Sequence, residues 1–500
     1  PLTPAQSATL VGALFGRSER ALPDELRARI VEPSGGNPLF IEETVRTLIA
    51  DGVLVREAEG WVVRPGAGGS GPPQTIHGLL LGRIDRLPSA ARRALHEAAV
   101  VGPTFAQALL RQVAADPESL DAALATLVDD GLIVPAGDAV AAAYRFSHGL
   151  FHEVAYQNLL ARRRTELHGR IGEAIERQCG GVPARLEDLQ ALGHHFRLGA
   201  DQPRAARYLI AAGDWARGLY ANADAIRSYE LALEALAACS DHEGRTVEVE
   251  ERLGDVLAPD GRIADALLHL EAARTARSRQ GDSIGQARLL RKIAALRWEG
   301  GDRAGAGRCL DDALALIADE PPHIEHGKLH QELGQRAFRG GDHAAALRWT
   351  QRAIDEVERL CALEPEATAD DERERSAAFA LALNTQGAAL ARCDRLAEAI
   401  ARLERSVEVA RAADLPQVEC RALSNLGVLY SSRDPQRAID ACERGLQTAQ
   451  RIGDVGLQSR LYANLAVAYC TLTNRCDERG VGAARSAIDI DRRTGQLDHL

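Results

Sequence analysis

The sequence lacks methionine altogether, and only Lys292 and Lys328 of its 60 basic residues are lysines. Because even the first position is not methionine, we expect the chain to be a processed or excised piece of a longer protein. Aromatic residues make up only 4% of the 500 residues, too few for a typical β-sandwich. Hydrophobic residues reach 46% and charged residues 26%, which is typical of a folded protein, and their Ala/Leu richness favours helices.

Long apolar runs, cysteine motifs and a positive net charge are also absent. No apolar stretch approaches the ~18 residues that span a bilayer, and no signal-peptide pattern opens the chain. The nine cysteines contain no CxxC pair, so neither a disulfide framework nor a zinc site is indicated. The net charge of −11 argues against nucleic-acid or membrane binding by the whole chain. We therefore expect a cytoplasmic protein.

A repeat of about 40 residues occupies the second half of the chain. Short turns recur at Asp260-Gly261, Gly301-Asp302, Gly341-Asp342, Asp394 and Asp434. A small residue precedes each of these five turns by several residues, and a sixth continues the series after the last turn; these residues are Gly254, Ala294, Gly334, Gly387, Gly427 and Ala466. Both series contain one longer step of 53 residues, whose excess falls on residues 363–371. These features predict a helical-repeat array in which a polar insertion lengthens one inter-repeat connection.

The repeats resemble tetratricopeptide repeats. Residues 426–430, Leu-Gly-Val-Leu-Tyr, match the L-G-x-x-Y pattern of the first helix of that repeat, and residues 192–196 and 465–469 are close variants. The small residue lets the two helices of a repeat approach each other closely. HEAT-type repeats share the longer period but lack this pattern. The resemblance implies stacked helix pairs whose concave groove binds a protein or peptide.

The region between residues 40 and 165 has a different pattern. Residues 52–56 and 61–64 predict a β-hairpin, and a Gly/Pro-rich linker follows at 65–73. Helices are predicted at 75–86, 89–101, 104–114 and 117–130, the last with Asp116 as its N-cap and Gly131 as its stop. Strands at 132–135 and 143–146, on either side of Gly137-Asp138, complete a pattern that favours a winged-helix domain.

The predicted fold class is mainly α, with a winged-helix domain and short β-hairpins followed by a tetratricopeptide-like α-solenoid. The predicted segments are helices at 1–52, the hairpin and linker at 53–73, and the winged-helix domain with its following helix at 74–165. A helical connector with irregular first repeats is predicted at 166–240, and the array at 241–500. Gly193 and Gly213 are only 20 residues apart, so the start of the array departs from the 40-residue rule.

The segment Gly-Asn-Pro-Leu-Phe-Ile-Glu-Glu at 36–43 predicts a turn followed by a helix that begins at Pro38. Together with residues 75–102 and 144–160, it resembles the lid and winged-helix regions of signal-transduction ATPases of the STAND class. That resemblance implies that residues 1–52 are part of the ATPase lid, that Pro38 packs on adenine and that Asn37 also contacts the nucleotide. The interpretation from the residues alone is a helix N-terminus.

A second residue enters through the same resemblance. The pattern Phe-Ser-His-Gly-Leu at 146–150 is similar to the wing-strand motif in which a histidine contacts the ADP β-phosphate, and it implies that role for His148. An imidazole can donate a hydrogen bond to a phosphate. The alternative is a histidine that packs at the corner between strand and helix.

Several catalytic and cofactor motifs are missing or incomplete. Neither lysine lies in a Gly-x-x-x-x-Gly-Lys-Ser/Thr loop, so no catalytic residue is predicted, and ATP or ADP with magnesium is expected only in a longer parent protein. The glycines at 66–71 match G-x-G-x-x-G, but two prolines follow in place of a helix, which indicates a linker. His323, His326 and His330 share one helical face, which favours a solvated face over a metal site.

The sequence therefore predicts the sensor portion of a nucleotide-dependent signalling protein. Its array would bind a partner and act through the winged helix on an upstream ATPase. Residues 145–160 and 220–236 resemble segments attached to bacterial adenylate or guanylate cyclases, which implies a cyclase as the effector. The alternatives are a non-enzymatic tetratricopeptide scaffold or part of a transcription regulator or protein kinase. DNA binding is disfavoured because the expected recognition helix carries acidic residues and no Lys or Arg.

Overall fold

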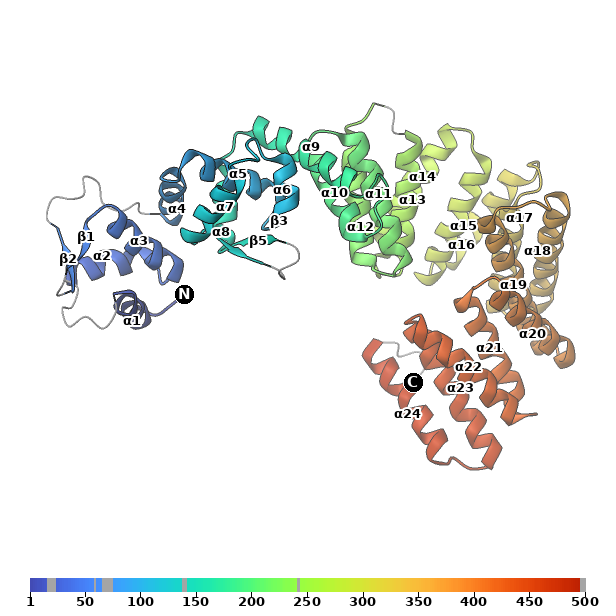
Figure 1. Ribbon diagram of the computed structural model, residues 1–500. Helices are drawn as coiled ribbons and strands as arrows, with labels where there is room; N and C mark the ends of the chain where they lie inside the picture. Colours follow the sequence, from blue (N-terminus) through green and yellow to red (C-terminus); the bar gives the residue numbers. More distant parts are fainter. Residues whose placement is uncertain (16–23, 58–59, 65–74, 137–141, 241–242, 495–500) are drawn as a thin grey trace. The chain divides into compact units, whose positions relative to one another are not determined.

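The computed structural model describes residues 1–15, 24–57, 60–64, 75–136, 142–240 and 243–494 (Figure 1). Most of these residues are helical. The chain divides into two compact units, Pro1–His242 and Glu243–Leu500, which are called unit 1 and unit 2 below. Within the described ranges, no helix is both long enough and apolar enough to cross a membrane.

Unit 1 begins with a small helical layer that carries a hairpin. Its helices are α1 (Pro4–Leu14), α2 (Asp24–Ser34) and α3 (Pro38–Ala50). Strands β1 (Leu54–Glu57) and β2 (Gly60–Val63) pair antiparallel, with Leu54 opposite Val63, at the positions predicted for a hairpin. The buried core of this layer consists of Val11, Phe15, Ile30, Ile41, Val45, Leu48 and Leu54. The predicted linker at 65–73, with its glycine-rich motif, lies outside the described residues.

A second layer of unit 1 combines helices with a three-stranded sheet. Its elements are α4 (Ile76–Asp85), α5 (Ser89–Val101), β3 (Thr104–Ala106), α6 (Gln107–Val113), α7 (Leu120–Asp129), β4 (Ile133–Pro135) and β5 (Ala143–Phe146). The central strand, β5, pairs antiparallel with both β3 and β4. Gly131 has a φ of 66° and ends α7, as predicted. The predicted turn at Gly137-Asp138 lies outside the described residues.

Two predicted helix starts in this layer were wrong. The segment 104–114 begins as strand β3, because Phe105 is buried, pairs with Tyr144 and stacks on its ring. Helix α7 starts at Leu120 and not at 117, so Asp116 is not its N-cap. The Asp116 carboxylate instead accepts a hydrogen bond from the Ser119 backbone N–H at 3.3 Å, which closes a turn ahead of the helix.

Unit 1 ends in helices that pack one on the next. They are α8 (Gly149–Gln157), α9 (Ala161–Gln178), α10 (Leu186–Leu198), α11 (Gln202–Gly218) and α12 (Asn222–Ala237). Gly193 packs against Leu209, and Gly213 packs against the ring of Tyr229. Three successive helices therefore use the same close contact at a 20-residue spacing, which explains why this region departs from the 40-residue period.

Buried histidines join α8, α9 and α10. Tyr156 Oη and His168 Nε2 are hydrogen-bonded at 2.9 Å, as are the Nδ1 atoms of His168 and His195. His195 is buried and His194 is exposed. Burial, followed by neighbouring imidazole charges, lowers the pKa of His168 to about 4 and that of His195 to about 3.

These histidines make unit 1 sensitive to acid. Below the ordinary pKa of 6.5 the unfolded chain binds protons that the folded imidazoles do not, so stability falls as the pH drops from 6.5 towards 4. At pH 5 each group costs on the order of 2 kcal/mol. In urea unfolding between pH 7 and 5, His195→Gln should lose less stability than the wild type. The exposed control His77→Gln should keep the wild-type slope, and equal slopes in all three proteins would contradict this assignment.

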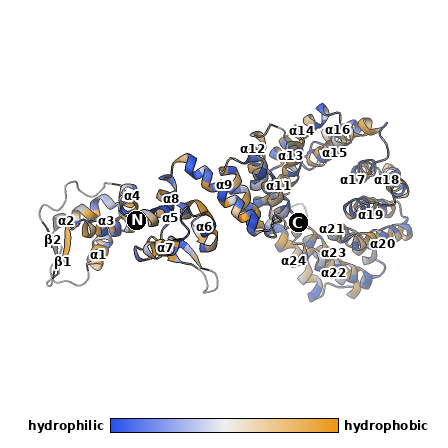
Figure 2. Ribbon diagram, turned by 45° about the horizontal axis from the view of Figure 1, so that its top comes forward, coloured by the Kyte–Doolittle hydropathy of each residue, from blue (hydrophilic) through white to orange (hydrophobic). Residues whose placement is uncertain are grey.

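Residues 243–494 of unit 2 form six helix pairs that follow an arc (Figure 2). In order, the pairs are α13 (Glu243–Leu257) with α14 (Ile263–Arg279), α15 (Ser283–Glu299) with α16 (Arg303–Ile317), α17 (Ile324–Arg339) with α18 (His343–Leu363), α19 (Ala369–Arg392) with α20 (Leu396–Ala412), α21 (Pro416–Ser431) with α22 (Pro435–Arg451), and α23 (Val455–Thr473) with α24 (Glu478–Thr494). The first helix of each pair lies towards the inside of the arc. This arrangement confirms the predicted helical-repeat array.

The predicted turns and small residues hold each pair together. Gly261, Gly301 and Gly341 adopt φ values between 82° and 86°, and Asp394 has a φ of 58°. The small residue of the first helix packs against the second helix. A Cβ atom on Gly387 would lie 2.7 Å from Leu403 Cγ and 3.1 Å from a backbone carbonyl oxygen. Glycine is therefore required at this contact.

The 13-residue excess lengthens helices and not a loop, so the predicted long connection was wrong. Helices α18 and α19 have 21 and 24 residues, and only 364–368 lie between them. Thr368 and Asp371 form a capping box that starts α19, because each side chain accepts the other's backbone N–H. The lengthened helices and α20 line a pocket of about 470 Å³ that includes Val357, Phe379 and Val409.

Gly387→Ala should destabilise unit 2 by about 1–3 kcal/mol, since the added methyl group would overpack the α19–α20 contact. Gly482 supplies the matched control: it lies in α24 with open space where a Cβ would be placed. Gly482→Ala should leave stability unchanged or raise it by up to about 1 kcal/mol, because alanine favours helix. Urea unfolding midpoints measure both, and equal effects of the two substitutions would contradict the close-contact assignment.

Candidate functional site

The structure places Asn37 and Pro38 at the N-terminus of α3. Asn37 is the N-cap residue, and its side-chain oxygen accepts the Leu39 backbone N–H at 3.1 Å. Pro38 is the first helical residue and is exposed. Gly36 has a φ of 78° and lies directly against the Leu2 backbone, so a side chain has no room there. The predicted turn and helix start are confirmed, while the nucleotide contacts stay a prediction.

His148 is the N-cap residue of α8, two residues after β5 ends. Its Nδ1 atom accepts the Leu150 backbone N–H at 3.2 Å, and the imidazole is exposed. An acceptor at Nδ1 requires that the neutral ring carry its proton on Nε2. His148 therefore lies at the corner between strand and helix, but its imidazole is exposed and is not packed there.

An arginine that the sequence analysis missed connects four helices of unit 1. Arg83 on α4 pairs with the buried carboxylate of Glu43 on α3 and donates to the Asp130 carbonyl at the end of α7. Its guanidinium also lies 5.2 Å from the ring centroid of Phe151 on α8. A cleft of about 390 Å³ adjoins it, lined in part by Arg46 and Arg86. Nothing in the local sequence around Arg83 signals these distant partners.

The inner helices of unit 2 carry their polar side chains at matching repeat positions. The sixth residue before each small residue defines the inner column, which contains Glu248, Arg288, Lys328, Leu381, Arg421 and Arg460. Four of these six residues are cationic. Because they recur once per repeat, they occupy the same position on each first helix, and the first helices lie towards the inside of the arc. The sequence predicted a binding groove but did not identify this column.

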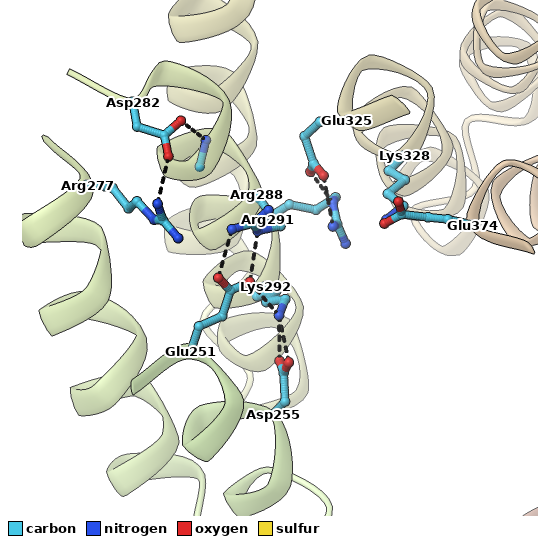
Figure 3. A network of polar contacts seen from close by, with 11 residues as sticks. Glu251, Asp255, Arg277, Asp282, Arg288, Arg291, Lys292, Glu325, Lys328 and Glu374 are labelled. Atoms are coloured by element: carbon cyan, nitrogen blue, oxygen red, sulfur yellow. Dashed lines mark hydrogen bonds and ion pairs between the residues drawn. The ribbon is translucent and has the colours of Figure 1, made fainter. Parts of the chain in front are cut away.

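Ion pairs connect neighbouring inner helices in the first half of the array (Figure 3). Lys292 Nζ lies 2.8 Å from a Glu251 carboxylate oxygen and 2.7 Å from one of Asp255. Arg288 also pairs with Glu251 at 2.9 Å. Burial raises the pKa of Glu251, but the Lys292 and Arg288 charges outweigh it, so that the pKa is lowered overall. The Glu251 carboxylate therefore neutralises Arg288, the cation of the inner column on α15.

Ion pairs also connect α15 with α17 and α17 with α19. Arg291 Nε lies 2.5 Å from the carboxylate of Glu325, whose side chain is only 2% exposed. Burial lowers the pKa of Arg291, and the Glu325 charge more than offsets that effect, giving a raised pKa. Lys328 pairs with Glu374 on α19. Burial first, and the nearby Arg291 charge second, lower the pKa of Lys328.

In the second half of the array, asparagine side chains connect the neighbouring first helices. Asn425 on α21 donates to the side-chain oxygen of Asn384 on α19 at 2.9 Å. Asn464 on α23 donates to the backbone carbonyl and hydroxyl oxygens of Ser424 at 3.0 and 2.9 Å. These neutral contacts link α19, α21 and α23. The charge that links the earlier helices is therefore replaced by amide hydrogen bonds.

The three histidines with helical spacing are engaged separately. His323 is the N-cap residue of α17, where its Nδ1 accepts the Glu325 N–H at 3.1 Å. His326 Nε2 lies 2.9 Å from the Ile317 carbonyl oxygen. His330 stacks on Trp349, and burial lowers its pKa to about 4. In the part of the chain that the structure describes, no three His, Cys, Asp or Glu side chains are arranged to hold a metal ion.

No protein-family model matches the chain. It is 28% identical over 245 residues to an uncharacterized protein of Rhizobium meliloti, a match that covers 49% of this chain. The chain spans only 23% of the length of that relative.

Structural similarity extends to several helical-repeat proteins. A STAND protein with a tetratricopeptide repeat sensor from Pyrococcus horikoshii aligns with 99% of this chain and 67% of its own, at 13% identity and a TM-score of 0.48. A Rap protein complexed with competence and sporulation factor aligns with 70% and 93%, at 12% identity and 0.46. The quorum sensor NprR of B. thuringiensis aligns with 68% and 92%, at 10% identity and 0.41. Similarity at this level does not establish a common function.

Removing the Glu325 carboxylate should destabilise unit 2 strongly, because Arg291 would be left largely buried without its partner. We expect Glu325→Ala to cost about 3–5 kcal/mol in urea unfolding. The control is Glu398→Ala, whose ion pair with Arg395 is more than half exposed on both sides. That substitution should cost less than about 1 kcal/mol. A similar loss in both variants would show that the Glu325 pair is no more important than a surface pair.

Proposed function

We propose that this chain is the regulatory, ligand-binding part of a signalling protein, in which the array of unit 2 binds a protein or peptide. The observation that carries the proposal is the inner column of repeated cationic positions on the first helices, which lie towards the inside of the array. Stacked helix pairs present an extended surface that suits an extended partner. The fixed ion pairs of α13, α15 and α17 hold that surface in shape.

The second part of the proposal is that unit 1 transmits binding to an upstream ATPase. The order α5, β3, α6, α7, β4, β5 supports a winged-helix assignment for residues 74–165. Arg83 would let such a domain act as a lever, because it connects the lid-like helix α3 with α4, α7 and α8. The resemblance to STAND ATPases suggests a nucleotide cyclase as the effector in the parent protein.

In this proposal the nucleotide is ATP or ADP with magnesium, bound mainly by the parent's ATPase core. Asn37 and Pro38 would contact the base, and His148 would donate from Nε2 to a phosphate. The hydrogen bond that His148 Nδ1 accepts supports this role, because it sets the tautomer that a phosphate needs. The acidic residues Asp121 and Asp129 on α7 disfavour DNA binding by the same domain.

The test is nucleotide affinity in the longer parent protein. His148→Ala should weaken binding of a fluorescent ADP analogue about tenfold, the effect of losing one hydrogen bond to a charged group. His77→Ala, at another exposed position of unit 1, is the control and should bind normally. Unchanged affinity in His148→Ala, with normal folding by circular dichroism, would remove His148 from the site. If the parent protein binds no nucleotide, the signalling-ATPase proposal is wrong and the non-enzymatic scaffold is the function that stays.

A further inference from the structure

A ten-residue motif occurs twice in unit 2, on the inner helices α21 and α23. Residues 421–430 and 460–469 both read Arg-x-x-x-Asn-Leu-small-Val-x-Tyr. In both copies the arginine, Arg421 or Arg460, stands six residues before the small residue and so belongs to the inner column. The two asparagines are the ones that link α19, α21 and α23.

The tyrosines at the end of the motif are engaged by the outer helices. Tyr430 donates to Glu404 at 2.7 Å, and Tyr469 donates to Glu443 at 2.8 Å. The guanidinium of Arg437 lies over the Tyr430 ring, and that of Arg479 lies over the Tyr469 ring. The asparagine and tyrosine positions of both copies therefore have structural partners.

The arginines of the motif have no such structural partners. Arg421 and Arg460 are exposed, and neither side chain makes an ion pair or hydrogen bond with any described residue. The same holds for Arg339 at the end of α17. By contrast, Arg288 and Lys328 in the same column pair with Glu251 and Glu374. The cations are thus neutralised in the first half of the column and left unneutralised in the second.

The charges of Arg339, Arg421 and Arg460 lie close enough to act on one another. Crowding by protein atoms lowers the pKa of Arg421, and the neighbouring charges of Arg460 and Arg339 lower it further. Two carboxylates lie near the group: the Asp454 charge raises the pKa of Arg421, and the Glu332 charge raises it less. Burial raises the pKa of Glu332, although Arg291, Arg339 and Arg421 act in the opposite direction. An anion placed near Arg421 would be attracted by three arginines and repelled by two carboxylates.

Apolar side chains lie two helical turns further along the same face. Val428 and Val467, seven residues after Arg421 and Arg460, are 53% and 55% exposed. Residues seven apart share a face of an α-helix. Each copy of the motif therefore offers a cation and an exposed apolar side chain together, which a small inorganic anion would not use in full.

We propose that Arg421 and Arg460 bind two carboxylate side chains of an extended acidic peptide segment, while Val428 and Val467 contact its apolar residues. This inference rests on the proposed function and specifies the ligand class. Packed helices lie about 8–10 Å apart, and an extended chain in the polyproline II conformation advances about 3.1 Å per residue, with every third side chain on the same side. The two acidic residues are therefore about three positions apart in the ligand.

The experiment uses the full chain and two blocked, fluorescein-labelled octapeptides. One contains two glutamates separated by two residues and flanked by leucines, and the other has glutamine in place of glutamate. In fluorescence anisotropy, the acidic peptide should bind at least about tenfold more tightly. The double variant Arg421→Gln/Arg460→Gln should lose this preference and bind both peptides alike. The control is Arg402→Gln/Arg485→Gln, which removes two exposed arginines from the outer helices α20 and α24 and should behave as wild type.

Three results would overturn the inference. If both peptides bind equally to the wild type, peptide binding by the array stands but acid selectivity is wrong. If inorganic phosphate displaces the labelled acidic peptide at the same concentration as the unlabelled acidic peptide does, the site binds small anions in general. If neither peptide binds, the ligand class is wrong, while nucleotide binding by the parent still tests the signalling proposal separately. Circular dichroism of both double variants ensures that only folded proteins are compared.

Discussion

Close approach of paired helices is the constraint on which the rest of unit 2 depends. At Gly387 a single added carbon would meet both Leu403 and a backbone carbonyl. Because the same contact recurs at Gly254, Gly334 and Gly427, each first helix is held at a similar depth against its second helix. Because this depth is equal, corresponding residues of successive first helices occupy equivalent positions on the inner side of the array. The inner column is a consequence of this packing.

Those features that depend on local chemistry could be predicted from the sequence. The turns at Gly301 and Gly341 need positive φ, and the small residues need room, so both leave a periodic signal. The start of α3 was equally readable, because Asn37 followed by Pro38 is a strong helix-start pattern. Composition and period together sufficed for a mainly helical, repeat-containing chain.

The features that the sequence did not reveal depend on residues far apart in the chain. Strand β3 forms because Phe105 meets Tyr144, and no local pattern distinguishes that segment from a helix. The Arg83 contacts reach Glu43 and Asp130, each more than a helix length away along the chain. Likewise, which cations of the inner column are neutralised depends on the neighbouring helix.

The separation between packing residues and inner-column residues has an evolutionary consequence. The tyrosine and the small residue of both motif copies are committed to the helix pair, whereas Arg421 and Arg460 make no hydrogen bond or ion pair with a described residue. Substitutions at these two positions would change which ligand is recognised with little effect on folding, since exposed side chains without partners contribute little to stability. Genes encoding such arrays can therefore diversify their specificity one repeat at a time, under weak constraint from the scaffold.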